Sequence, residues 1–163
     1  MKRRILAAFC SAIVVSLGLV VGASTTAGAT GTMTVKISSP IQVTNKLMVS
    51  IPVQVVCDPL EGDTTVDRVA VQVQQANGKS VSSASGSVEG GAASPFRGEP
   101  FLTCDGTTVN TVVVNVVGNG PFHGGGAIVS ASATHAVGSC TFFCQQTDSE
   151  FAGLGPVAMQ MRG

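Results

Sequence analysis

Apolar and polar side chains alternate along most of this chain after residue 30. The clearest alternation runs from Leu47 to Cys57, where apolar residues hold one parity and mostly polar residues the other. A strand with one buried face has this period of two. The same pattern predicts strands at Val69–Gln74, Val112–Val116 and Ala127–Ala133, and shorter ones at Thr32–Ile37, Phe101–Cys104 and Val157–Met161. No segment shows the spacing of an amphipathic helix.

Turn residues separate these predicted strands. Asn77-Gly78 supplies the two positive-φ positions of a tight hairpin, so a partner strand is expected to return through Lys79–Ser87. The segment Ser82–Pro95 is rich in Ser, Gly and Ala, which predicts a mobile loop or a weak edge. Pro52 interrupts the clearest strand, because proline cannot donate to a ladder and suits an edge or a bulge.

Seven or eight short strands without intervening helices predict an all-β fold, an antiparallel immunoglobulin-like β-sandwich. The chain has no Trp and no Tyr, so it lacks the core Trp and the tyrosine corner of antibody domains. The wider group of immunoglobulin-like sandwiches stays open.

The first 29 residues have the pattern of a secretory signal peptide. Three basic residues, Lys2 to Arg4, precede an apolar run from Ile5 to Val21, and small residues then end in Ala27-Gly28-Ala29. Cleavage after Ala23 fits almost as well, and a retained membrane anchor is disfavoured. We therefore predict a signal peptide at 1–29 and one secreted domain at 30–163, extracellular and without a membrane segment after cleavage.

Charge and composition limit the partners. Without the leader, six basic side chains remain against nine acidic ones, and the basic residues are scattered singly along the sequence. Nucleic acid is therefore not expected as a partner. The absence of Trp and Tyr also argues against a carbohydrate-binding module, which usually stacks such rings on sugars.

Four cysteines follow the leader, an even number that suggests disulfides in an oxidising compartment. Cys57 and Cys104 lie at the ends of two predicted strands, whereas Cys140 and Cys144 are close neighbours. Of the three possible pairings we predict Cys57 with Cys104 and Cys140 with Cys144.

Two patterns resemble known chemistry but are better explained structurally. His123-Gly124-Gly125-Gly126 matches an oxyanion-hole loop of some hydrolases, yet the chain has no G-x-S-x-G elbow, so a tight connection is expected. Cys140, Cys144, His135 and His123 contain the atom types of a zinc site, but disulfide formation is favoured in an exported chain.

The acidic residues after Cys57, namely Asp58, Glu61 and Asp63, predict a solvated turn and not a calcium loop. No catalytic constellation has an identifying spacing. We therefore expect no enzyme activity, no metal and no cofactor.

The segment Cys140-Thr141-Phe142-Phe143-Cys144 is the one candidate interaction site. Two adjacent aromatic rings cannot both point inward from so short a loop, so Phe142 or Phe143 is a candidate anchor for an extracellular protein partner. The alternative is that one ring caps the end of the sandwich.

Residues 51–57, Cys104-Asp105-Gly106-Thr107 and the cysteines at 140 and 144 carry a resemblance. Over roughly residues 33–144 the chain resembles small secreted actinobacterial β-sandwich proteins of uncharacterised function. It is more distantly similar to the neocarzinostatin-type chromophore carriers, although the long Cys57–Cys104 spacing departs from their short links.

These observations predict a secreted, non-catalytic binding or structural domain. A small-molecule carrier is the alternative, and a secreted protease inhibitor that uses the Phe142-Phe143 loop comes third. A cleft lined by Phe96, Phe101 and Phe122 would favour the carrier.

Overall fold

The computed structural model describes residues 32–91, 99–140 and 144–163, and every regular element in them is a strand. The eight strands are β1 (Thr34–Ile37), β2 (Ile41–Asn45), β3 (Met48–Val56), β4 (Thr64–Asn77), β5 (Ser80–Gly91), β6 (Asn110–Val117), β7 (Gly125–Cys140) and β8 (Cys144–Arg162). Nothing in the described part forms a helix with the length and apolar character needed to cross a bilayer. The predicted all-β class is confirmed.

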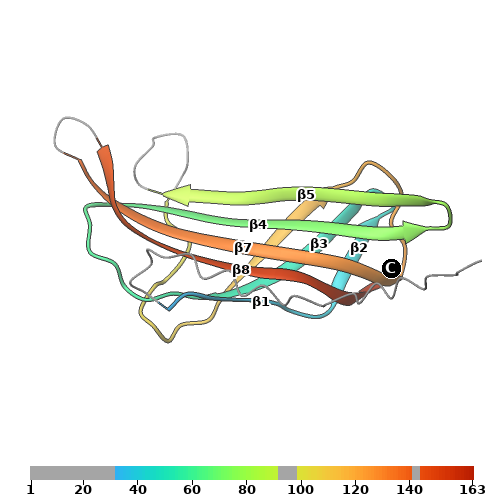
Figure 1. Ribbon diagram of the computed structural model, residues 1–163, viewed down its shortest axis with the longest axis horizontal. Coiled ribbons are helices and arrows are strands. Elements are labelled where there is room, and N and C mark those ends of the chain that lie inside the picture. Colours follow the sequence, from blue (N-terminus) through green and yellow to red (C-terminus); the bar gives the residue numbers. More distant parts are fainter. Residues whose placement is uncertain (1–31, 92–98, 141–143) are drawn as a thin grey trace, which may run out of the picture.

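The strands form two layers that cross at an angle (Figure 1). One layer has the order β5-β4-β7-β8, and all its neighbours are antiparallel. In the other layer β3 pairs with β6 on one edge and with β1 and β2 on the opposite edge. The two layers are joined where β2 runs parallel to the end of β8 and where Ala84 bridges to Gly118.

The core lies between the layers and consists of alternate residues of the long strands. In β3 the buried residues have the parity that the sequence predicts, and Val69, Val71 and Val73 repeat this in β4. Leu47 is an exception: it precedes β3 and is 48% exposed. The other inward side chains come mainly from β6 and β7, and they include Val114, Val116, Ala127, Val129, Ala131 and Ala133.

Pro52 lies in the middle of β3, a central strand, without breaking it. The N–H and C=O of one residue point to the same edge of a strand, and the Pro52 carbonyl accepts from the Ser38 amide. On that edge β2 pairs with β3 up to Ser50 and β1 pairs from Val53 onward. The missing donor therefore falls in the gap where the chain passes from β1 to β2.

The predicted hairpin between β4 and β5 is confirmed, but its turn is displaced by one residue. Asn77 pairs with Ser80, so the loop is Gly78-Lys79, and among the described residues only glycines, Gly78 included, have positive φ. Glycine at the first loop position suits a type II′ turn. The side chain of Asn77 instead donates to the Pro121 carbonyl at 2.8 Å.

Of the two alternatives for the Ser-rich segment, the edge is confirmed over Ser82–Gly91, where the backbone pairs with β4 as the edge strand β5. Two other predictions about secondary structure were wrong. Residues 101–104 form no strand, because the Asp67 carboxylate accepts their first two amides. β8 begins at Cys144, well before the predicted Val157.

A disulfide joins Cys57, directly after β3, to Cys104, with Cα atoms 4.7 Å apart. This long-range pairing is the predicted one. For the second predicted disulfide, the backbone register pairs Cys140 with Cys144 across the β7–β8 hairpin. Their side chains lie outside the described part of the chain, so that disulfide stays a prediction.

Candidate functional site

The outer face of the β5–β4–β7–β8 layer is hollowed along its length (Figure 1 views this face). Three hollows follow β4: about 440 Å³ along Thr64 to Arg68, about 570 Å³ along Arg68 to Gln72, and about 380 Å³ beside Gln74 and Ala76. Together we call them the outer trough. At about 3.3 Å per residue, this stretch of β4 is roughly 40 Å long.

The floor of the central hollow is made of small side chains. Residues directly opposite each other on neighbouring strands share a face of the sheet, so each cross-strand row lines one level of the trough. One row runs across all four strands and comprises Ser87, Ala70, Ser132 and Gly153. The row beside it comprises Ser85, Gln72 and Ser130. Five of these seven residues carry a hydroxyl or amide group, and Leu154 and Phe151 add apolar surface to the same hollow.

The next row forms a rim with larger side chains, in the order Glu89, Arg68, Thr134 and Phe151. Arg68 Nε lies 3.2 Å from Glu89 Oε1, and Arg68 lines both the first and the central hollow. Both charged side chains are partly exposed, so the pair contributes little to stability. In this pair the positive charge of Arg68 and the negative charge of Glu89 offset each other at the rim.

Phe151 lies at the β8 end of this rim and is 51% exposed. A Cβ atom added to Gly153 would lie 3.6 Å from both Cε1 and Cζ of the ring. The ring thus extends over a residue that has no side chain to cover it. Its apolar surface is available beside the hydroxyl-lined floor.

The third hollow, beside the β4–β5 hairpin, is apolar. Its lining includes Ala76, Val81, Ile128, Ala158 and Met159. Val81 is 60% exposed and Ile128 is 53% exposed, which is unusual for such side chains on a small domain. The trough therefore changes from polar at its centre to apolar at this end.

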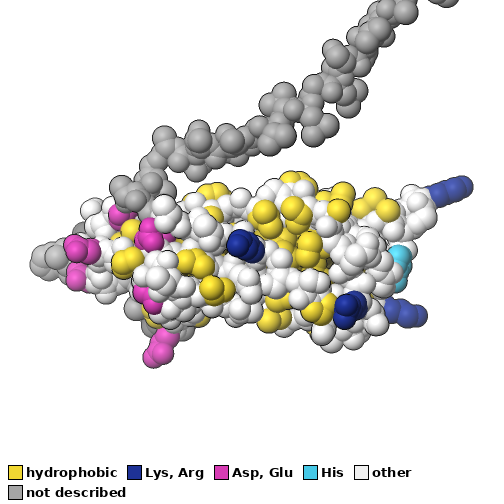
Figure 2. Space-filling view, turned by 90° about the horizontal axis from the view of Figure 1, so that it is seen from below, with side chains coloured by type: hydrophobic (Ala, Val, Ile, Leu, Met, Phe, Trp, Pro, Cys, Tyr) yellow, Lys and Arg dark blue, Asp and Glu magenta, His cyan; other side chains and the backbone are white. Residues whose placement is uncertain are grey.

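Figure 2 shows a different face, along β1 and β8. Acidic side chains gather at one end of the molecule, and Lys and Arg lie at the centre and the opposite end. Apolar side chains gather in between. Val35, Ile37 and Val43 of β1 and β2 are partly buried and pack against the core, so we assign them to the fold.

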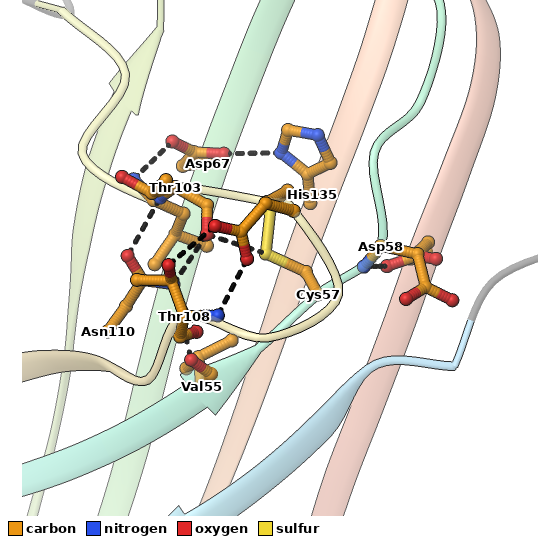
Figure 3. The surroundings of a disulfide bond; sticks show 12 residues. Val55, Cys57, Asp58, Asp67, Thr103, Thr108, Asn110 and His135 are labelled. Carbon is orange, nitrogen blue, oxygen red and sulfur yellow. Dashed lines mark hydrogen bonds and ion pairs between the residues drawn. A yellow bond between two sulfur atoms is a disulfide. The ribbon is translucent and has the colours of Figure 1, made fainter.

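A polar row lies on the inner side of the β5–β4–β7–β8 layer. Asp67, His135 and Glu150 are direct cross-strand neighbours on β4, β7 and β8, and they are 0%, 4% and 0% exposed. His135 Nδ1 lies 2.7 Å from Asp67 Oδ1 (Figure 3). The other Asp67 oxygen accepts the amides of Phe101 and Leu102, both at 2.9 Å.

Glu150 completes this inner row. Its Oε2 accepts the Asp58 amide at 3.2 Å, whereas Oε1 is buried without a hydrogen-bond partner among the described residues. Burial raises the pKa of the Glu150 carboxyl, the Asp58 amide lowers it, and the Asp58 charge raises it further.

The hydrogen bonds of the inner row hold the two segments that the disulfide joins. Asp67 binds the chain just before Cys104, and Glu150 binds the residue just after Cys57. An arrangement of carboxylate, imidazole and carboxylate can move protons, but all three groups are buried and none of them lines the three hollows of the outer trough. We assign the row a structural role.

Two exposed turns near the disulfide are organised by aspartates. Asp105 accepts the amides of Thr107 and Thr108, and the Thr108 hydroxyl also donates to it, which holds the pKa of Asp105 far below its usual range. The Thr32 amide and hydroxyl similarly lower the pKa of Asp58. These carboxylates fix local backbone, as expected for turns.

Of the candidate zinc ligands, the two histidines are not brought together, and the side chains of Cys140 and Cys144 lie outside the described part of the chain. His135 binds Asp67, whereas the His123 ring binds Asn77 at the opposite end of β4. Over the described residues no three His, Cys, Asp or Glu side chains form a group that could hold a metal ion. The His123–Gly126 segment connects to β7, and its backbone is held by both atoms of the Gln75 amide.

The aromatic residues singled out by the sequence do not form one site. Phe122 is 2% exposed in the core, and Phe101 packs beside Gly90 and against the core, so these two do not line a cleft. Phe96, Phe142 and Phe143 lie outside the described residues. The role of the Phe142-Phe143 loop therefore stays a prediction.

The sequence analysis missed the outer trough and the inner row. A signal for the inner row existed, because Asp67 and Gln75 continue the parity of Val69, Val71 and Val73 and must therefore be buried with them. The trough had no such signal, since it depends on the register of four strands.

Comparison with known proteins gave no relationship: no protein-family model, no curated protein and no solved structure matches this chain.

Proposed function

We propose that the protein is a secreted, non-catalytic binding domain whose ligand lies in the outer trough. The observation that carries this proposal is the series of three hollows along β4 on the β5–β4–β7–β8 face, with small polar side chains on the floor of the central one and an uncovered ring at its rim. The inward positions are filled by a packed core, so a ligand must bind outside it.

An immunoglobulin-like sandwich is the fold we propose for this domain. The order β1-β3-β6 corresponds to strands A, B and E, and β5-β4-β7-β8 corresponds to C′, C, F and G. The first two strands add support. β1 pairs with β3 in one layer, and the chain then passes to β2, which pairs with β8 in the other layer.

Secretion is supported by the basic and apolar leader with its small-residue end. The Cys57–Cys104 disulfide is compatible with an oxidising compartment. An extracellular protein needs a stable scaffold, and the disulfide closes a loop with a sequence separation of 47 residues between the end of β3 and the segment before β6.

The test is to map where chemically different probes bind. Amide chemical shifts of the secreted chain would be followed with neutral oligosaccharides, acidic oligosaccharides, an extended peptide and a fused-ring aromatic. We expect at least one class to shift amides at Ser85, Ser130, Ser132 and Phe151. Shifts that map only to the β3–β6 face, or no shifts with any class, would overturn the proposal.

The apolar hollow beside the hairpin favours a small-molecule carrier as a second candidate. Its volume of about 380 Å³ lies within the range of ligand pockets. An amphipathic dye such as anilinonaphthalene sulfonate should then bind there, and Ile128→Ser should weaken it. Dye binding that is insensitive to this change would remove the candidate.

A further inference from the structure

The central hollow offers hydrogen-bonding groups that the fold does not use. Among the described residues, no hydrogen bond is made by the hydroxyls of Ser85, Ser87, Ser130 and Ser132 or by the Gln72 amide. Each hydroxyl can donate one hydrogen bond and accept others, and the amide can do both. The floor thus presents donors and acceptors at a spacing set by the strands, about 4.8 Å across and about 6.6 Å along the sheet.

Arg68 is the one charged residue among the described residues that line this hollow. Its Nε lies 3.2 Å from Oε1 of Glu89, which lines the neighbouring first hollow. An anionic ligand would have to compete with Glu89 for the guanidinium, and a cationic ligand would have to compete with Arg68. The lining therefore matches an uncharged ligand.

Phe151 adds an apolar contact of fixed position. Its ring extends over Gly153 and is half exposed, at the end of the row that also holds the ion pair. A sugar ring presents hydroxyls at its edge and C–H groups on its faces, so it can use the hydroxyl-lined floor and the aromatic ring together.

The length of the trough favours a chain over a single small molecule. The hollows follow β4 from Thr64 to Ala76, and Arg68 connects the first two. An extended peptide is the less suitable occupant, because main-chain recognition uses a sheet edge and this trough lies on a sheet face.

From these contacts, and on the basis of the proposed function, we infer that the outer trough binds a linear, uncharged polysaccharide. Sugar rings lie over the serine floor, and one ring stacks on Phe151. The composition argued against a carbohydrate module because Trp and Tyr are absent, but one exposed Phe beside unused hydroxyls supplies the same two kinds of contact.

The experiment is calorimetry and amide-shift mapping of the secreted chain with soluble hexasaccharides. The neutral probes are hexaoses of β-1,4-glucose, β-1,3-glucose, α-1,4-glucose, β-1,4-xylose and β-1,4-mannose. The charged comparison is hexagalacturonate. We expect at least one neutral hexaose to bind, with shifts centred on Ser130, Ser132 and Phe151.

Variants locate the contacts. Phe151→Ala should weaken binding roughly 2- to 10-fold, as expected for the loss of an aromatic stacking contact. Ser130→Ala with Ser132→Ala should weaken it by a similar factor or more. Val113→Ala is the matched control, because Val113 is equally exposed at 51% but lies on β6 in the other layer. Thermal unfolding of each variant verifies that it folds.

The outcomes separate this inference from the proposed function. If no neutral hexaose binds, or only the galacturonate or a peptide shifts trough amides, the polysaccharide inference is wrong while a trough-binding function survives. If a neutral hexaose binds with shifts outside the trough and Phe151→Ala has no effect, the polysaccharide inference is wrong, and the proposed function is wrong as well if the galacturonate, the peptide and the aromatic probe also leave the trough amides unshifted.

Discussion

At the residue scale, Glu150 is a buried carboxyl whose hydrogen bonding is incomplete among the described residues. It is 0% exposed, one carboxyl oxygen accepts the Asp58 amide, and the other has no partner among the described residues. A buried charge without full compensation destabilises a folded state. Glu150 is nonetheless positioned to hold the backbone that follows the disulfide.

Replacing Glu150 by Gln should therefore stabilise the protein at neutral pH. Burial raises the pKa of the Glu150 carboxyl above its usual 4.5. The stability that the protonated carboxyl contributes is therefore fully present below pH 4.5. The contribution is lost as pH rises through the higher folded-state pKa. The amide of the variant cannot ionise, so we expect E150Q to be more stable by about 1 kcal/mol at pH 7.

The measurement is thermal unfolding from pH 4 to pH 8. The advantage of E150Q should shrink toward pH 4, where the native carboxyl is protonated as well. Glu61→Gln is the control, since Glu61 lies at the same end but is exposed. An advantage that is the same at every pH would show that charge burial is not its cause.

At the element scale, the register of long strands creates features that no single segment contains. The alternation of buried and exposed residues in β3 and β4 was predictable from the sequence, because each strand has its own period. The start of β5 was predictable from the Asn77-Gly78 turn, but its continuation to Gly91 and the first half of β8 were not, since few of their residues are apolar and pairing with β4 and β7 orders them. The outer trough likewise depends on the register of four paired strands, so no single segment predicts it.

The Cys57–Cys104 disulfide acts at this scale, because it links the end of β3 to the segment before β6. Removing it by Cys57→Ala with Cys104→Ala should lower the free energy of unfolding by about 4 kcal/mol, since the unfolded chain regains the freedom of a long loop. Denaturant unfolding measures this difference. The inner-row acceptors of Phe101, Leu102 and Asp58 stay in place, so the strands should still form.

Reduction provides the control for that experiment. Dithiothreitol should destabilise the native chain but should change the double variant little. A loss below about 1 kcal/mol in the variant would mean that the inner row alone fixes these segments.

At the scale of the whole molecule, the core between the two crossing layers stabilises the fold, and the proposed ligand site lies on an outer face. The packed core between them uses nearly all inward apolar side chains, and the disulfide and the inner row secure one end. The outer face of β5–β4–β7–β8 then carries side chains outside this core, among them the serines of the central hollow. A scaffold with this division can present a ligand site without weakening its core.

Export of this scaffold should be visible in the mass of the secreted chain. We expect protein from the culture medium of an expressing bacterium to begin near Thr30, because small residues precede that position and suit signal cleavage. It should contain no thiol that iodoacetamide can alkylate, since four cysteines remain and an oxidising compartment pairs them.

Replacing Ala27 and Ala29 by Lys should block cleavage there and serves as the control. A secreted chain that retains Lys2 to Arg4 would contradict the leader assignment, and alkylation of Cys140 or Cys144 alone would contradict the second disulfide while leaving the Cys57–Cys104 disulfide intact.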